Sequence, residues 1–233
     1  PCKRICRPNG DSLVNVSAEE RKKALVDYAL PKNIKKMQAD MEKYKIFYDK
    51  WFFESELHKS GAVKAVVDLL TKKGLTYEKE GAVWYKNKEV LTQKLLKEGK
   101  SQKYIDNLEL KDDVLIRQNG NPTYFTADIA YHKNKFDRGF TTLIDVWGAD
   151  HHGHVMRMKG AMDAIGYDGD KLNVVLMQLV KLVKDGELVR MSKRTGKAIQ
   201  LGDLLDEVPV DSARFLFNTK RLTHRWTLTL TLQ

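Results

Sequence analysis

The chain has 233 residues, of which 42% are hydrophobic and 31% are charged, and its net charge is +10. This length is sufficient for one large domain or two small ones, and the composition excludes a wholly disordered chain. No apolar run approaches the ~20 residues of a membrane helix, and the first residues hold no apolar signal segment. We therefore expect a cytoplasmic chain without membrane contacts.

The positive charge suggests a nucleic-acid partner, but its distribution weakens that interpretation. Residues 1–10 and 219–233 each carry three cations and no acid, so the two ends hold six of the ten net charges. The long segment between them has an ordinary charge balance. Cys2 and Cys6 are the only cysteines, and without a second Cys or His pair nearby we expect reduced thiols rather than a zinc site.

Helices predominate in the first half of the sequence. Ser17 and Glu20 form the pattern of a capping box, and the apolar periodicity after them predicts a helix that Pro31 breaks. A second helix follows, with Met37 expected in the core, and the aromatic segment 46–52 predicts a strand. Three elements are expected next: a helix over 62–70, a hairpin over 75–85 turning at 80–81, and a lysine-rich helical excursion on the surface over 87–107.

Strands and helices alternate from residue 112 onward. We expect strands over 114–116, 141–147 and 172–180, helices over 126–132, 155–165, 201–207 and 211–217, and turns at 119–122 and 185–186. Such alternation with short turns predicts a parallel α/β sheet. The ligands of these sheets bind beyond the carboxyl ends of the strands.

The segment WGADHHGH, residues 147–154, lies at one such strand end. Gly148 allows a close backbone approach, and the Asp150 carboxylate is suited to accept hydrogen bonds from ribose hydroxyls. His151, His152 and His154 could donate to a phosphate or a carboxylate. Two alternatives are a polar strand end with capping histidines and a metal site, although only His151 and His154 have a helical ligand spacing.

Two further segments carry candidate chemistry. The loop RMSKRTGK, residues 190–197, brings four cations together, which suits a triphosphate, although an ordinary basic surface loop has the same composition. Tyr124 and Asp128 lie four residues apart, so on one helix they share a face and could hold a cationic side chain. The alternative for Asp128 is an acidic residue near the start of a helix that interacts favourably with the helix dipole.

Taken in order, NPTYFTADIAYH, VWGADHHGHVMRMKGAM and VRMSKRTGKAIQLGDLLDEV resemble the catalytic domain of bacterial arginyl-tRNA synthetases over about residues 11–218. The resemblance implies an α/β fold: a partial Rossmann-type catalytic domain of the class I aminoacyl-tRNA synthetases, with a small α+β insertion. It also implies an arginine–tRNA ligase reaction. ATP and arginine form arginyl-adenylate, and the arginyl group then passes to tRNA(Arg).

The resemblance also implies a role for each matching residue. Residues 190–194 resemble the KMSKS signature, with Arg in its first and last positions. The implied roles are catalysis by Ser192 and Lys193, ATP binding by Gly148, Asp150, His151, Met191 and Lys193, and arginine binding by Tyr124, Asp128 and His152. ATP would bring Mg²⁺ with it. We expect no metal ligands from the protein, and we expect a monomer.

The family's other signature, His-Ile-Gly-His, has no match in residues 1–110. Residues 151–154 fit its letters, but their flanks match the later segment. We therefore expect a partial catalytic domain with weak or no activity, and the alternative is a non-catalytic remnant that binds RNA or nucleotide. The expected divisions are an atypical end at 1–10, catalytic domain at 11–59, an insertion at 60–110, the second Rossmann half at 111–218 and an atypical end at 219–233. We hypothesise that both ends are translated out of frame.

Overall fold

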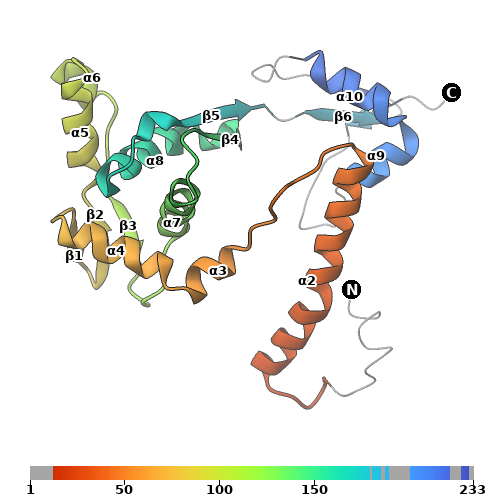
Figure 1. Ribbon diagram of the computed structural model, residues 1–233, viewed down its shortest axis with the longest axis horizontal. Helices are drawn as coiled ribbons and strands as arrows, with labels where there is room; N and C mark the ends of the chain where they lie inside the picture. The colour runs from red at the N-terminus through yellow and green to blue at the C-terminus, as the bar shows by residue number, and fades with distance from the viewer. Residues whose placement is uncertain (1–12, 179, 185–186, 189–199, 221–226, 231–233) are drawn as a thin grey trace. The chain divides into compact units, whose positions relative to one another are not determined.

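The computed structural model describes residues 13–178, 180–184, 187–188, 200–220 and 227–230 (Figure 1). The chain divides into two compact units. The first unit comprises residues 1–50 and 188–220, and the second comprises residues 51–187 and 221–233.

The first unit is built on the long helix α2 (Ala18–Lys43). Its capping box is confirmed, because the Ser17 hydroxyl accepts from the Glu20 N–H and the Glu20 carboxylate accepts from the Ser17 N–H. The predicted break is wrong, since Pro31 lies inside one continuous helix. Proline removes one hydrogen bond and crowds the carbonyl four residues earlier, yet the helix continues on both sides of it. The core position expected for Met37 is also wrong, because its side chain is 49% exposed and no residue of α2 is buried.

Two short helices complete this unit where the sequence predicted them, α9 (Leu201–Glu207) and α10 (Val210–Asn218). Ion pairs join them to the end of α2. Lys43 contacts Asp206 at 2.5 Å, and Lys45 contacts Asp211 at 2.6 Å. The Arg214 guanidinium donates to the backbone carbonyl of Tyr44 at 2.8 Å.

The second unit begins with α3 (Glu54–Lys59) and α4 (Ala62–Lys72), followed by an antiparallel sheet. Its strands are β1 (Thr76–Lys79), β2 (Ala82–Tyr85) and β3 (Asp113–Ile116). The predicted hairpin is confirmed, with Glu80 and Gly81 both at positive φ in its turn. The strand expected at 114–116 is confirmed as β3, but it pairs antiparallel with β2 and is no part of a parallel sheet.

The parallel pairing lies farther along the chain. Strand β4 (Leu143–Gly148) pairs in parallel with β5 (Leu172–Met177), and the connection between them holds helix α8 (His152–Ile165). Short 3₁₀ turns, η1 (Ala149–His151) and η2 (Gly169–Lys171), flank α8. This strand–helix–strand unit is the α/β arrangement predicted from the sequence. Strand β6 (Lys181–Lys184) pairs in parallel with β8 (Thr227–Leu230), and β7 (Glu187–Leu188) follows β6 in the sequence.

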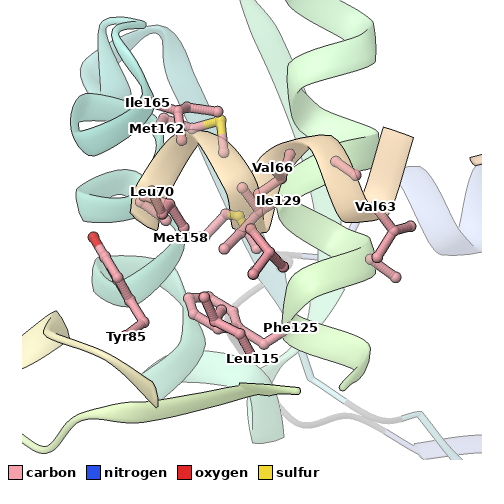
Figure 2. Close-up of a cluster of buried hydrophobic side chains, with 14 of the residues drawn as sticks. Val63, Val66, Leu70, Tyr85, Leu115, Phe125, Ile129, Met158, Met162 and Ile165 are labelled. Atoms are coloured by element: carbon pink, nitrogen blue, oxygen red, sulfur yellow. The ribbon is translucent and has the colours of Figure 1, made fainter. Parts of the chain in front are cut away.

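The hydrophobic core of this unit lies where α4, α8 and α7 (Tyr124–Asp137) meet (Figure 2). Val66, Leu70, Ile129 and Met162 are fully buried there, with Tyr85 and Leu115 from the antiparallel sheet beside them. Residues on both sides of position 110 therefore share one core.

The segment 87–107 forms α5 (Asn87–Lys97) and α6 (Gln102–Asp106). Its helical character is confirmed, but the expectation of a solvated excursion is wrong. Leu91 and Leu95 lie four residues apart on α5, and both are buried. Gly160 of α8 lies beside Leu91, because a Cβ at position 160 would be 2.6 Å from the Leu91 methyl group. The surface lysines concealed an apolar stripe that packs on α8.

The strand predicted over 46–52 is wrong, because these residues have no regular secondary structure. One aromatic side chain of this segment, Phe52, packs on α7, where it stacks on Tyr131 with ring centroids 4.7 Å apart, whereas Phe47 and Tyr48 are exposed. Within the described residues, no helix combines the length and the apolarity needed to cross a bilayer.

Candidate functional site

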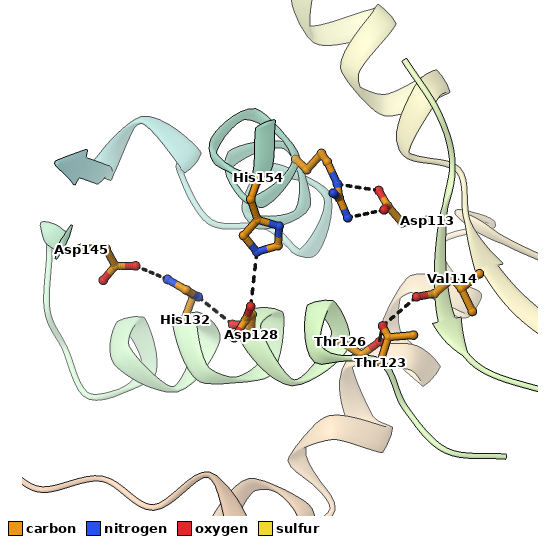
Figure 3. A network of polar contacts seen from close by, with 9 residues as sticks. Asp113, Val114, Thr123, Thr126, Asp128, His132, Asp145 and His154 are labelled. Carbon is orange, nitrogen blue, oxygen red and sulfur yellow. Dashed lines mark hydrogen bonds and ion pairs between the residues drawn. The ribbon is translucent and has the colours of Figure 1, made fainter. Parts of the chain in front are cut away.

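The first turn of α7 is tied to strand β3 by two threonines. The Thr123 hydroxyl donates to the Val114 carbonyl at 2.7 Å (Figure 3). The Thr126 hydroxyl donates to the Leu115 carbonyl at 2.8 Å. Anchoring the first turn fixes the rotation of α7 about its axis and so the direction of the residues that follow on it. Another face of α7 carries Asp128, Tyr131, His132 and Lys135, and these four residues line a cavity of about 360 Å³.

Asp128 meets His154 of α8 in this cavity. The Nε2–H of His154 donates to the Asp128 carboxylate at 3.3 Å, since an ionised carboxylate can only accept (Figure 3). The His154 ring packs edge-on against Phe125 at 5.5 Å and lies 5.3 Å from the Trp147 ring. The Asp128 side chain remains 47% exposed, so its oxygens are also accessible to a ligand.

A second polar cluster lies deeper in the same cavity. His132 bonds to the Asp128 carbonyl through Nδ1 at 2.7 Å and to the Asp145 carboxylate through Nε2. The ammonium of Lys135 donates to the other Asp145 oxygen at 2.7 Å. Burial acts to raise the pKa of Asp145, but the hydrogen bonds and charges of His132 and Lys135 outweigh it and hold that pKa below its usual value.

The residues implied to bind arginine are only partly brought together. Tyr124 and Asp128 do share α7 at the predicted spacing, but the Tyr124 side chain is 79% exposed and its ring lies 5.9 Å from the Arg117 guanidinium. His152 begins α8 and lines a different cavity, between α5, α8 and β5. In the Asp128 cavity the histidine contact comes from His154 instead.

The residues implied to bind ATP ribose lie at the carboxyl end of β4. Gly148 ends the strand, and Asp150 and His151 follow in η1, with their side chains 81% and 61% exposed. The Asp150 carboxylate lies over Gly148, where an added Cβ would collide with it. An exposed carboxylate at a strand end, just before a helix, fits the hydroxyls of a ribose.

The remaining candidates lie outside the described residues: Met191, Ser192 and Lys193 of the basic loop, and the two cysteines. The turn expected at 185–186 also lies outside them. Across the described ranges, no three His, Cys, Asp or Glu side chains are grouped so that they could hold a metal ion.

No role was predicted from the sequence for His132, Lys135 or Asp145, although the sequence contains a signal for each of them. His132 and Lys135 follow Asp128 by four and seven residues, which places all three on one helix face. Asp145 interrupts an apolar strand at an alternating position, and a carboxylate that points inward requires partners.

A sequence model of the family described as tRNA synthetases class I (R), catalytic domain, matches residues 19–223. The chain belongs to this family, the class I arginyl-tRNA synthetase catalytic domains. The resemblance drawn from the three motifs is thereby confirmed, together with the partial α/β fold that it implied.

Two curated relatives are named arginine–tRNA ligase. The chain is 52% identical over 213 residues to the protein of Ruminiclostridium cellulolyticum, and 55% identical over 213 residues to that of Caldanaerobacter subterraneus subsp. tengcongensis. Both alignments cover 91% of this chain and 35% of the relative. The chain therefore spans about a third of the length of these relatives.

Solved structures agree with this assignment. An arginyl-tRNA synthetase structure from Campylobacter jejuni is 32% identical, with a TM-score of 0.77 over 97% of this chain and 45% of that one. A methionyl-tRNA synthetase from Mycobacterium tuberculosis, in complex with methionyl-adenylate, is 11% identical with a TM-score of 0.61. The latter likeness concerns the fold alone.

Proposed function

We propose that this chain provides the arginine-binding part and the ribose-binding part of an arginine–tRNA ligase site. The observation that carries this proposal is the Asp128 carboxylate. It lies in one cavity with His151 and Trp147, at the carboxyl end of strand β4. A guanidinium donates two parallel hydrogen bonds to a carboxylate, and aromatic rings favour a planar cation beside them.

In this proposal Asp128 binds the arginine side chain, with Tyr124 one turn earlier on α7. His154 orients the carboxylate by its hydrogen bond and takes the place that the resemblance gave to His152, which lines the other cavity. Because Asp128 is half exposed and pairs with a histidine rather than with a lysine or arginine, it can accept an incoming guanidinium.

The ribose of ATP would bind at Gly148, Asp150 and His151, and its phosphates at the loop that holds Met191, Ser192 and Lys193. ATP, with its Mg²⁺, supplies the α-phosphate to which the arginine carboxylate forms a bond, and pyrophosphate leaves. In the second step a hydroxyl of the tRNA(Arg) terminal ribose attacks the arginyl carbonyl, and AMP leaves. Lys193 would stabilise negative charge that develops on the phosphates.

Arginine binding tests the proposal directly. We expect calorimetry to detect binding of arginine to the chain. Asp128→Asn should weaken it by roughly 10- to 100-fold, because a charge-assisted pair is lost. Asp68→Asn is the matched control, since it removes a carboxylate from an exposed pair with Lys64 on α4. Arginine binding that is unchanged in Asp128→Asn would contradict the proposal.

ATP–pyrophosphate exchange in the presence of arginine and tRNA measures the complete first step. We expect slow exchange, because electrostatic stabilisation requires all of its donors to be positioned at once and the His-Ile-Gly-His segment is not in this sequence. Fast exchange would show that the 233 residues hold a whole catalytic site. No observation among the described residues supports the alternative of a non-catalytic remnant that binds RNA.

A further inference from the structure

The two ring nitrogens of His132 both face hydrogen-bond acceptors. Nδ1 lies 2.7 Å from the Asp128 carbonyl oxygen, which can only accept. Nε2 contacts the Asp145 carboxylate, which can only accept while it is ionised. Both bonds form together only if both nitrogens carry a proton, and the ring is then an imidazolium.

The surroundings compensate such a buried cation. His132 is 3% exposed and Asp145 is 8% exposed, and an unpaired charge at either position would be strongly destabilising. Lys135 pairs with the second Asp145 oxygen and lies 4.4 Å from the Tyr131 ring centroid. His132 and Lys135 thus share one anionic partner, the Asp145 carboxylate.

Other charged or titratable groups lie farther from the His132 ring. From α8, His154 turns its Nε2 to the Asp128 carboxylate. From η1, His151 contacts Asp150 at 3.8 Å, and its ring lies 6.5 Å from Trp147. Trp147 itself packs edge-on against His132 at 6.2 Å. The described residues therefore show Asp145 as the anionic partner of the imidazole ring.

We propose that His132 is a doubly protonated positioning residue, which holds the Asp128 turn of α7 against strand β4 through Asp145. One bond of the ring reaches the backbone of the residue that would bind arginine, and the other reaches the strand whose carboxyl end would bind ribose (Figure 3). The ring sets the distance between the two parts of the site. This inference rests on the proposed role of Asp128 in arginine binding, but its first test does not.

The first test is the protonation state of the His132 ring in the unmodified chain. In ¹⁵N NMR spectra at pH 7, we expect both ring nitrogens of His132 to be protonated, with the signals assigned by their loss in His132→Gln. In Asp145→Asn the Nε2 proton should be absent, because an amide oxygen stabilises the cation far less than a carboxylate does. A neutral His132 ring in the unmodified chain at pH 7 would overturn the proposal, whether or not arginine binds.

The second test is arginine binding by the same variants. Asp145→Asn should weaken it by about 10-fold, because a displaced turn misaligns Asp128. His132→Gln keeps an amide donor and should lose less than His132→Phe, which has none. Asp68→Asn should leave binding unchanged. Equal binding by all these variants would overturn the positioning role. A loss in Asp145→Asn without one in Asp128→Asn would instead contradict the proposed function.

Discussion

Asp113 of β3 accepts two hydrogen bonds from the guanidinium of Arg157 on α8, and the bond from Nε is 3.0 Å long. The pair joins the antiparallel sheet to the helix that follows the candidate ribose site. Burial raises the pKa of Asp113, and Arg157 opposes that shift without reversing it. Keeping this buried carboxylate ionised therefore costs free energy, and the bidentate contact with the Arg157 guanidinium stabilises its charge.

Replacing Arg157 with lysine should destabilise the chain. An ammonium cannot reproduce two parallel bonds to one carboxylate, so Arg157→Lys should lower the free energy of unfolding by about 1–2 kcal/mol. Urea unfolding at pH 7 measures the change. Arg138→Lys is the matched control, because Arg138 is exposed beside Phe140, and it should change stability by less than about 0.5 kcal/mol. Equal effects of the two variants would refute the role given to Asp113.

The Asp145 cluster should make stability depend on acid pH. The pKa of Asp145 is lower in the folded chain than its usual value of 3.8, so its stabilisation is fully present above pH 3.8 and is lost as the pH falls through the folded pKa. Asp145→Asn should cost about 3 kcal/mol at pH 7, because it removes the anion that pairs with both His132 and Lys135. The difference from the unmodified chain should shrink below pH 3.8, and a constant difference down to pH 2 would contradict the assignment.

Two glycines of α8 should respond oppositely to alanine. A Cβ at Gly160 would lie 2.6 Å from a buried Leu91 methyl group, whereas a Cβ at Gly153 meets nothing within 4 Å. Gly160→Ala should destabilise by about 1–3 kcal/mol through overpacking. Gly153→Ala should stabilise by up to about 1 kcal/mol through helix propensity. Thermal unfolding of both variants tests the packing of α5 on α8, and the same shift in both would disprove it.

The core of the second unit should be sensitive to truncation at Leu70. This side chain is fully buried between α4 and its neighbours (Figure 2), so Leu70→Ala should cost about 2–5 kcal/mol. Leu96→Ala removes the same atoms from a side chain that is 47% exposed on α5, and it should cost less than about 1 kcal/mol. Denaturant midpoints compare the two variants. A cost at Leu96 as large as that at Leu70 would show that the buried cluster is not the stabilising core.

Local signals in the sequence predicted most of the elements of the second unit. The turn at Glu80 and Gly81 and the β4–α8–β5 succession depend on residues close together in the chain, and the structure confirms them. The strand over 46–52 and the break at Pro31 failed because they rested on local patterns that packing and helix continuity overrode. A strand requires a partner strand, and alternating aromatic residues cannot show that one exists.

The candidate site divides in the same way. The spacing of Tyr124 and Asp128 on one helix could be predicted, and so could the position of Gly148 and Asp150 at a strand end. The sequence could not show that His154, rather than His152, is the histidine beside Asp128. The two histidines lie two residues apart in the same short segment, and the rotation of α8 about its axis decides which of them faces the cavity.

The family, the order of the elements and the residue types available for chemistry follow from the sequence, because motifs and periodicity are properties of neighbouring residues. The contact of Asp145, seventeen residues after Asp128, with the His132 ring follows from the packing of helix α7 on strand β4 and could not be predicted from neighbouring residues. Such a contact depends on the packing of a helix on a strand. Burying the charged groups of this contact is favourable only when all of their hydrogen-bond and ion-pair partners are in place.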